Sequence, residues 1–326
     1  MGGAARQAAG MSDVPNLTDW LEEWAASRRH HLEASSVTSY RWMADTYLVP
    51  HLGHLRLNEL DVRTIEATYA HLLLRGGRRG QPLAPRTIAY AHAVLHRALV
   101  DAVRLGIVPA NPAAEVALPR RRADGAPPRR LHVWDADQVR HFLTATADEP
   151  HADLWAVALG TGMRRGELLG LRHRDVDLAA RRLTVATALT IVDGTPRWKP
   201  PKTGRSRTLS LDPRTTATLA RRIATAEQSD PDLPVFADAA GRPLDPNAVS
   251  AAWRSLCGRL DLPRIRLHDL RHTHATLLLA AGVPVKVVSE RLGHTKIAMT
   301  LDVYAHVLPA QDLAAAEVLG DLLGRP

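Results

Sequence analysis

Cysteine, lysine and long apolar runs are scarce in this sequence of 326 residues. Its one cysteine, Cys257, excludes a disulfide within the chain and fits a reducing compartment. The longest apolar stretch, near residues 275–285, is interrupted by Gly282 and Pro284 and is shorter than the ~18 residues that a membrane span needs. The first ten residues contain no hydrophobic stretch of the signal-peptide kind. We therefore exclude secreted, membrane-spanning and disulfide-stapled classes and expect a cytoplasmic protein.

Positive charge is abundant, and it is carried almost entirely by arginine. Four of the 42 basic residues are lysines and the other 38 are arginines; with 34 acidic residues the net charge is +8, which favours an anionic partner. Half of this excess lies in residues 119–130, where five arginines and one aspartate share a segment with three prolines and a glycine. Such a segment can neither remain helical nor bury much apolar surface, so we interpret it as an interdomain linker. It is either a solvated hinge or a strap that lies along a phosphate backbone. In the second case Arg120, Arg121 and Arg122 would contact the phosphates.

The periodicity of the chain changes at this linker. Before it, apolar residues at helical spacing predict four helices, near residues 19–26, 36–43, 62–72 and 85–103. Ser35, Ser36 and Thr38 are candidate N-caps of the second helix.

The segment after the linker mixes helical and strand patterns. Residues 183–192 alternate as a single strand, and Asp193-Gly194 predicts a turn. Short strands at 197–199 and 207–211 would complete one three-stranded sheet. The predicted fold is therefore mainly α with a small antiparallel β-sheet (α+β), in two domains.

Four islands of polar residues interrupt the second segment, at residues 161–178, 201–211, 268–282 and 293–307. Arg164 and Glu167 lie three residues apart and share a helical face, which by itself predicts an ordinary helix salt bridge. Lys202, in the second island, indicates almost nothing alone.

The third island raises the alternative of a metal site. His268 and His272 have the four-residue spacing that two imidazole ligands need on a helix, and His274 is nearby. The usual third ligand is not evident, however, and Arg271 between the two histidines would repel a cation. Metal binding is the disfavoured interpretation.

In this order the islands resemble the catalytic domain of the tyrosine recombinase (phage integrase) family. The motifs are T-G-M-R-x-x-E, P-K-T-G-x-S, H-D-L-R-H-T, L-G-H and T-L-D-V-Y-A-H. The helical segment before the linker, with Tyr40, the H-L-G at residues 51–53 and Asn111-Pro112, resembles the core-binding domain of the same family. The resemblance covers roughly residues 14–308.

The resemblance implies a division of the chain into five parts. These are a disordered N-terminus (1–13), a SAM-like core-DNA-binding domain (14–118), the basic linker (119–130), the catalytic domain (131–308) and a C-terminal helix (309–326). That last helix either folds onto its own domain or packs on a neighbouring protomer.

The resemblance also implies a role for each motif residue. Arg164 and Arg271 would clamp the scissile phosphate, while His268 accepts a proton and His294 hydrogen-bonds a phosphate oxygen. Tyr304 would be the nucleophile, Lys202 would protonate the leaving oxygen, and Glu167 would orient its neighbours. Because arginine and lysine supply the positive charge, no metal and no cofactor are expected.

The implied partner is double-stranded DNA with inverted-repeat core sites, bound in the nucleoid by a tetramer that assembles from monomers. Ser36 and the helix start at Arg86 and Thr87 are candidate DNA contacts. A mobile-element integrase is the leading interpretation; a chromosome-dimer-resolving recombinase and a type IB topoisomerase-like enzyme are alternatives. A DNA-binding regulator with a decayed site is a non-enzymatic rival, and delivery of Tyr304 in cis or in trans stays open.

Overall fold

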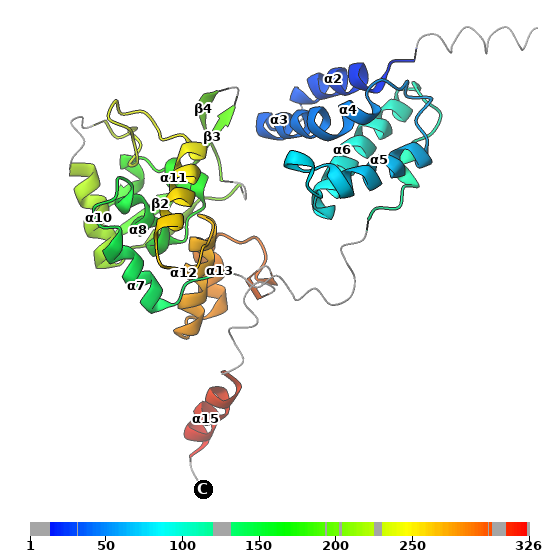
Figure 1. Cartoon of the computed structure of the whole chain (residues 1–326). Helices are drawn as coiled ribbons and strands as arrows, with labels where there is room; N and C mark the ends of the chain where they lie inside the picture. The colour runs from blue at the N-terminus through cyan, green and yellow to red at the C-terminus, as the bar shows by residue number, and fades with distance from the viewer. Residues whose placement is uncertain are drawn as a thin grey trace, which may run out of the picture. The chain divides into compact units, whose positions relative to one another are not determined.

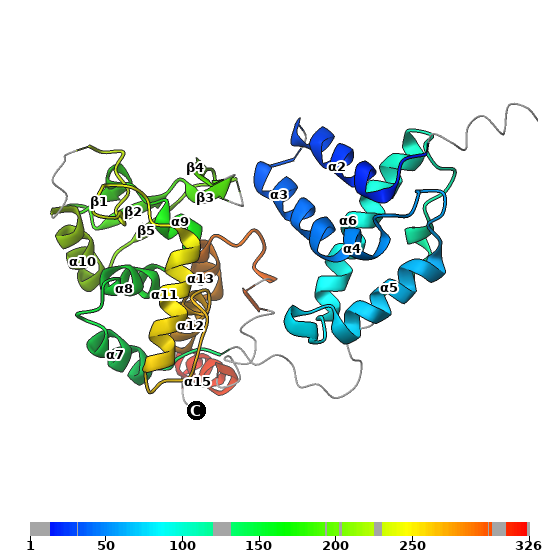
Figure 2. The ribbon, with the colours of Figure 1, turned by 45° about the horizontal axis from the view of Figure 1, so that its top comes forward.

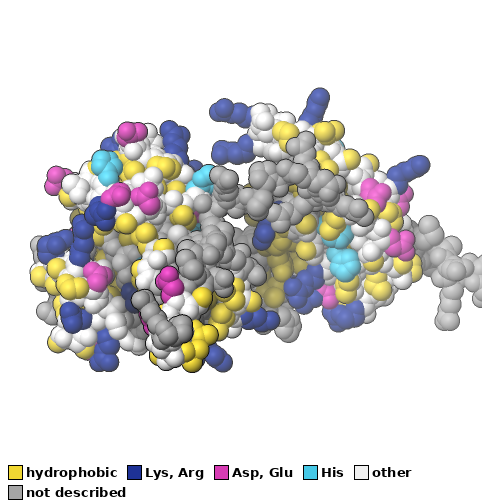
Figure 3. Space-filling model, turned by 90° about the horizontal axis from the view of Figure 1, so that it is seen from below, with side chains coloured by type: hydrophobic (Ala, Val, Ile, Leu, Met, Phe, Trp, Pro, Cys, Tyr) yellow, Lys and Arg dark blue, Asp and Glu magenta, His cyan; other side chains and the backbone are white. Residues whose placement is uncertain are grey.

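The computed structural model describes residues 14–30, 32–119, 132–192, 194–201, 204–224, 230–298, 300–301 and 311–324. The chain divides into two compact units, Met1–Pro128 and Arg129–Pro326 (Figure 1). Within the described ranges, no helix has both the length and the apolar character that crossing a bilayer requires. Lys and Arg side chains stand on the surface of both units, with carboxylates among them (Figure 3).

The first unit is helical throughout its regular structure. Its elements are α2 (Leu17–Ser27), η1 (Arg28–His30), α3 (Ala34–Met43), the π-helical turn η2 (Ala44–Leu48), α4 (Val49–Leu52), α5 (Val62–Arg75), η3 (Arg78–Gly80), α6 (Pro85–Arg104) and η4 (Pro112–Ala114). The Asn16 side chain caps α2 and the Asp61 side chain caps α5, each by accepting a backbone N–H of the first turn.

The predicted serine caps of α3 are wrong. The helix begins at Ala34, and the carbonyl of Glu33 accepts the N–H groups of Ser36 and Val37 at 2.8 and 3.2 Å. Ser36 therefore lies within the first turn, half-buried, rather than ahead of it.

A buried carboxylate ties α2 to α6 in the core of this unit. The apolar residues of α6 and α2 share one buried core, and Trp24 Nε1 donates to Asp101 Oδ2 at 2.7 Å. Asp101 also accepts from Arg28 and, at 3.3 Å, from Arg104. With 6% of its surface exposed, Asp101 relies on these donors in place of water.

The second unit combines helices with two small sheets (Figure 2). Its helices are α7 (Ala136–Ala145), α8 (Ala152–Thr161), α9 (Arg165–Leu169), η5 (His173–Asp175), α10 (Pro213–Ala224), α11 (Pro246–Arg259), α12 (Asp269–Ala280), α13 (Val285–Leu292) and α15 (Gln311–Leu323). Strands β1 (Val176–Asp177), β2 (Arg182–Val185) and β5 (Arg207–Ser210) form an antiparallel sheet in the order β1-β2-β5, and β3 (Ala188–Val192) pairs with β4 (Thr195–Lys199). The predicted class, mainly α with a small antiparallel β-sheet (α+β), is confirmed, although the structure has two small sheets.

The prediction of one continuous strand over 183–192, in one three-stranded sheet, is wrong. The chain leaves the first sheet after Val185, and the Thr187 hydroxyl donates to the Gly170 carbonyl at 3.2 Å. Gly170 lies so close to the start of β3 that a Cβ there would be 2.6 Å from Leu189 N. This contact with α9 turns residues 188–192 toward β4, so the alternation continues through a change of sheet.

An aromatic cluster anchors the helices that carry the site. Trp134 and Phe142 have ring centroids 4.8 Å apart, and Trp155 and Trp253 are 5.0 Å apart. Trp253 Nε1 donates to the carbonyl of Ile265 at 2.9 Å, which fixes the segment leading into α12. Helix α8 packs against both α10 and α12, so the ends of α8 and α12 are held in register. Cys257, on α11, is buried in the same core, and burial raises the pKa of its thiol to about 11.

Removal of the Asp101 carboxylate should destabilise the first unit. An Asp101→Ala variant leaves the Trp24 N–H and the Arg28 guanidinium without their buried acceptor, at a cost of about 3 kcal/mol. Hydrogen exchange of amides in α2 and α6 measures the loss directly. Asp45→Ala, at an exposed position of the same unit, is the control and should leave exchange unchanged. Equal protection in the two variants would contradict this account.

Candidate active site

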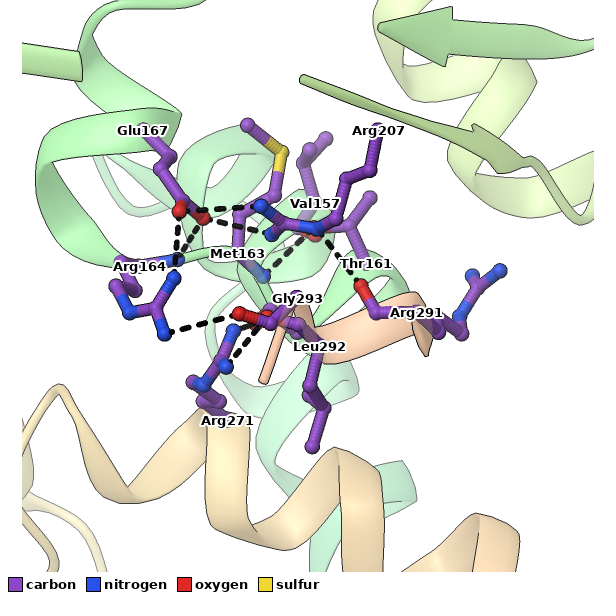
Figure 4. Close-up of polar contacts among 11 residues, drawn as sticks. Val157, Thr161, Met163, Arg164, Glu167, Arg207, Arg271, Arg291, Leu292 and Gly293 are labelled. Carbon is purple, nitrogen blue, oxygen red and sulfur yellow. Dashed lines mark hydrogen bonds and ion pairs between the residues drawn. The ribbon is translucent and has the colours of Figure 1, made fainter. Parts of the chain in front are cut away.

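Two arginines far apart in sequence bind one main-chain turn. Arg271, in the first turn of α12 and 4% exposed, donates from NH1 to the Gly162 carbonyl at 2.7 Å and from NH2 to the Leu292 carbonyl at 2.6 Å. Arg164, the N-cap of α9, approaches the next carbonyl, that of Gly293, from NH2 at 3.5 Å. Because the two guanidinium groups bind adjacent carbonyls, they lie side by side (Figure 4).

Glycine makes possible the two turns that end α8 and α13. Gly162 ends α8 with φ +64°, and a Cβ there would meet the His274 ring at 2.7 Å. Gly293 ends α13 with φ +66°, and a Cβ there would be 3.0 Å from Arg207 Cδ. A side chain at either position would strain the backbone and displace a neighbouring side chain.

The Glu167 carboxylate, 1% exposed, is shared by two arginines. Arg164 NH1 donates to Oε1 at 2.9 Å, and Arg207 donates to both oxygens, at 3.1 and 2.7 Å. Burial alone would raise the pKa of Glu167, but the hydrogen bonds and charges of Arg207 and Arg164 outweigh it and lower the pKa to about 2. The carboxylate therefore stays ionised across the physiological range.

Arg207 is a residue of this site that the sequence motifs did not single out. It opens β5, forty positions after Glu167, and its Nε also donates to the Arg291 carbonyl at 2.9 Å. The available signal was its place at the start of the strand that follows the P-K-T-G-x-S motif. Spacing alone could not connect it to Glu167.

Both predicted histidines lie in the field of the arginine pair. Burial, followed by the charges of Arg271 and Arg164, lowers the pKa of His294 to about 4, and its Nδ1 is 2.8 Å from Thr300 Oγ1. His268, the residue before α12, keeps part of its surface open, yet desolvation of its ring and then Arg271 lower its pKa too. Both imidazoles are therefore neutral near pH 7 and can accept a proton or a hydrogen bond.

The structure does not bring the three histidines of the metal alternative together. His268 and His272 stack edge to face with centroids 5.1 Å apart. The His274 ring is occupied elsewhere: Nδ1 bonds the Leu159 carbonyl at 2.7 Å and Nε2 accepts from Arg291 at 3.1 Å. In the part of the chain that the structure describes, no group of three His, Cys, Asp or Glu side chains is arranged to hold a metal ion.

Several predicted residues cannot be placed in this geometry. Lys202, Tyr304 and the linker arginines Arg120, Arg121 and Arg122 lie outside the described residues. The candidate DNA contacts of the first unit are described: Arg86 is exposed and Thr87 half-buried in the first turn of α6, and Ser36 lies on α3.

A basic cleft of about 420 Å³ adjoins His268. Arg165, Arg254 and Arg266 line it together with Ser250 and Trp253, and none of the described lining residues is acidic. Arg165 NH1 donates to Ser250 Oγ at 2.6 Å, and Arg254 Nε donates to the Ser250 carbonyl at 3.3 Å. The cleft thus extends the positive charge of the arginine pair along α11.

Neutral histidines make the stability of this unit sensitive to acid. The folded-state pKa of His274 is about 4, because of burial and then the Arg291 charge, with Arg271 lowering it and Asp212 raising it. As pH falls from 6.5 to 4, the unfolded chain takes up a proton that the folded chain refuses, and the free energy of unfolding decreases by up to about 1.4 kcal/mol per pH unit.

A His274→Gln variant should therefore lose less stability than the wild type between pH 6.5 and 4.5. Denaturant unfolding at several pH values measures the slope. His141→Gln, at an exposed position on α7, is the control and should keep the wild-type slope. If the two variants have the same slope, His274 is not the titrating group.

Comparison with known proteins identifies the family. Residues 132–311 match the phage integrase family, and residues 16–73 match the N-terminal SAM-like domain of phage integrases.

A tyrosine recombinase XerC-like protein of Caldanaerobacter subterraneus is 30% identical over 214 residues, which cover 59% of this chain and 54% of that protein. The ICEBs1 integrase of Bacillus subtilis is 29% identical over 205 residues, 60% of this chain and 56% of that protein. The chain thus spans about half the length of these two relatives. The integrase of Mycobacterium phage L5 is 25% identical over 313 residues, 94% of this chain and 79% of that protein.

Solved structures share the fold. The Tn1549 transposon integrase in complex with a circular-intermediate DNA has a TM-score of 0.73 at 21% identity, over 91% of this chain and 98% of that one. A lambda integrase dimer bound to a COC′ core site has a TM-score of 0.67 at 16% identity, over 93% and 81%. Since the family match over residues 132–311 covers more than half of the sequence and contains the arginine pair, the chain belongs to the phage integrase family of tyrosine recombinases.

Proposed function

We propose that this protein cuts and rejoins DNA at specific sites through a covalent 3′-phosphotyrosyl intermediate, without metal or ATP. The observation that carries the proposal is the placement of Arg164 and Arg271 on adjacent carbonyls of one turn, with His268 and His294 within their field. A pair of guanidinium forks can bind the non-bridging oxygens of one phosphate bidentately, and it holds positive charge where the transition state gathers negative charge.

The chemistry conserves the energy of the phosphodiester bond. The Tyr304 oxygen attacks the scissile phosphorus, forms the O–P bond of the intermediate and releases a 5′-hydroxyl. Only ~0.1% of a free phenol is ionised at pH 7, so the proton must be removed, and the neutral His268 is suited to accept it. Lys202 protonates the departing 5′-oxygen, and His294 hydrogen-bonds a phosphate oxygen. Attack by the 5′-hydroxyl of another strand reverses these steps and completes the exchange.

The proposed substrate is double-stranded DNA with inverted-repeat core sites, joined by a tetramer that assembles on the DNA from free monomers. Relatives support core-site binding and a tetramer: lambda integrase has been solved as a dimer on a core site and as a tetramer on a Holliday junction. We assign residues 14–118 to core-site binding through Ser36, Arg86 and Thr87. The linker at 119–130 would lie along the phosphate backbone, and the catalytic domain would comprise residues 131–308.

We assign the C-terminal segment, residues 309–326, to contact with a neighbouring protomer. Its helix α15 exposes a set of large apolar side chains that water solvates poorly, with Leu322 and Leu323 78% and 77% exposed. Burial of this set against a second copy would stabilise the tetramer.

Among recombinases, a mobile-element integrase is the function that we favour. The Mycobacterium phage L5 integrase matches over 94% of this chain, whereas the XerC-like relative matches over 59%. Chromosome-dimer resolution is the second candidate, supported by the higher identity of that XerC-like match.

Loss of the Tyr304 hydroxyl should abolish covalent capture of DNA. Nicked duplexes that tile the DNA flanking the gene serve as probes, because a nick lets the short cleaved fragment diffuse away and traps the intermediate. Wild-type protein should form an adduct that survives denaturing electrophoresis, and Tyr304→Phe should form none. Arg164→Ala and Arg271→Ala should slow adduct formation by ~10²–10³-fold. Tyr47→Phe, in the first unit, is the control; an adduct with Tyr304→Phe would refute the assignment of the nucleophile.

Removal of a cleft arginine should weaken DNA binding in a salt-dependent way. If Arg254 neutralises one backbone phosphate, Arg254→Ala lowers the slope of log K against log salt by ~0.9. Arg221→Ala is the matched control, because this exposed arginine pairs with Asp153 at 2.8 Å and does not line the cleft. Fluorescence anisotropy with the duplex that forms the adduct, at several salt concentrations, measures the slopes. Equal slopes for both variants would show that DNA does not occupy the cleft.

A further inference from the structure

Arg207 connects the Glu167 carboxylate, which binds Arg164, to the main chain beside the Gly293 turn. Its NH1 and NH2 hold the Glu167 carboxylate, and its Nε holds the Arg291 carbonyl, just before the turn that both site arginines bind. The Arg207 side chain is 10% exposed, compared with 25% for Arg164 on the other side of the same carboxylate. Arg164 is therefore the more accessible of the two to a phosphate.

We propose that Arg207 is a positioning residue, which fixes Arg164 through Glu167 and fixes the 291–294 turn through the Arg291 carbonyl. This inference rests on the proposed function, since it concerns the geometry of the same site. Arg207 touches no reacting atom. Its contribution is to keep Arg164 and His294 at a fixed distance from each other before DNA binds.

The shared carboxylate explains why a second arginine is needed. Glu167 is 1% exposed, so each of its oxygens requires donors from the protein. Arg164 supplies one side-chain and one backbone N–H, both at 2.9 Å, and Arg207 supplies a fork that meets both oxygens. With Arg207 present, Glu167 cannot rotate away from Arg164, and the Arg164 guanidinium keeps one orientation.

The turn at residues 291–294 packs closely against Arg207. Gly293 packs so near Arg207 that an added Cβ would be 3.0 Å from both its Cδ and its NH1. The amides of Gly293 and His294 donate to the carbonyls of Glu290 and Ser289, at 2.9 and 3.0 Å. Loss of the Arg207 hydrogen bond to the Arg291 carbonyl would weaken these two amide hydrogen bonds. The carbonyls that accept from both site arginines would then be held less firmly.

Lysine cannot replace this fork. A lysine ammonium can satisfy one oxygen of Glu167, but it cannot hold both oxygens and a main-chain carbonyl in one plane. Arg207→Lys should therefore keep the charge and lose the positioning.

The test compares single-turnover cleavage by saturating protein on the nicked duplex that forms the adduct. Arg207→Gln and Arg207→Lys should cleave ~10–100-fold more slowly than wild type, with DNA affinity changed less than threefold, because a displacement of about 1 Å in a site can cost ~10²-fold in rate. Arg182→Gln, at an exposed position on the adjoining strand β2, is the control and should cleave at the wild-type rate. Wild-type cleavage by Arg207→Gln would overturn the proposal.

Two further variants separate positioning from folding. Glu167→Gln/Arg207→Gln removes the buried charges together, so it should fold more stably than Arg207→Gln alone and still cleave slowly. Arg164→Ala/Arg207→Gln should be slower than Arg164→Ala by less than the Arg207→Gln factor, because Arg207 acts in part through Arg164. Recovery of full cleavage in the first double variant, or multiplicative losses in the second, would contradict the proposal.

A readout that needs no DNA keeps this inference apart from the proposed function. In Arg207→Gln, but not in Arg182→Gln, the amides of Gly293 and His294 should exchange with solvent faster. If wild-type protein forms no adduct on any duplex, the proposed function fails while the exchange result still tests the positioning role. If adducts form and the exchange of these amides is unchanged, the positioning role fails while the function stands.

Discussion

The site depends on positive charge being concentrated without being neutralised. Glu167 carries one negative charge and is flanked by two guanidinium groups, so the trio of Arg164, Glu167 and Arg207 keeps a net charge of +1. Arg271 is held by carbonyl oxygens, which lend only partial negative charge. Electrostatic preorganisation of this kind is effective because the protein has already met the cost of gathering like charges when it folds.

Two helix ends provide the anchoring carbonyls. Gly162 caps α8 and Leu292 is the last residue of α13, so both carbonyls that Arg271 binds lie at helix C-termini, where the helix dipole is negative. Left-handed glycines turn the chain away immediately afterwards and leave these carbonyls open to side chains. The placement of the two arginines is thus a property of where α8 and α13 end.

The sequence predicted residues better than it predicted their connections. The order of the motifs singled out Arg164, Glu167, His268, Arg271 and His294, and these residues lie together in the structure. Helical periodicity located the helices of the first unit because their apolar faces repeat regularly.

The split of residues 183–192 between two sheets left no trace in the pattern, since alternation has the same period on either side of the break. Arg207 was equally hidden: the need for a second cation arises only from the burial of Glu167, which depends on tertiary packing and not on local spacing.

The state of Cys257 has a practical consequence for physical studies of this protein. The thiol is buried on α11, and its raised pKa keeps it protonated at neutral pH, so it reacts slowly with maleimide and iodoacetamide reagents. The chain holds no other cysteine. A fluorophore or spin label can therefore be directed to one engineered surface cysteine in each unit while the native thiol stays in place, which opens the distance between the two units to measurement by energy transfer.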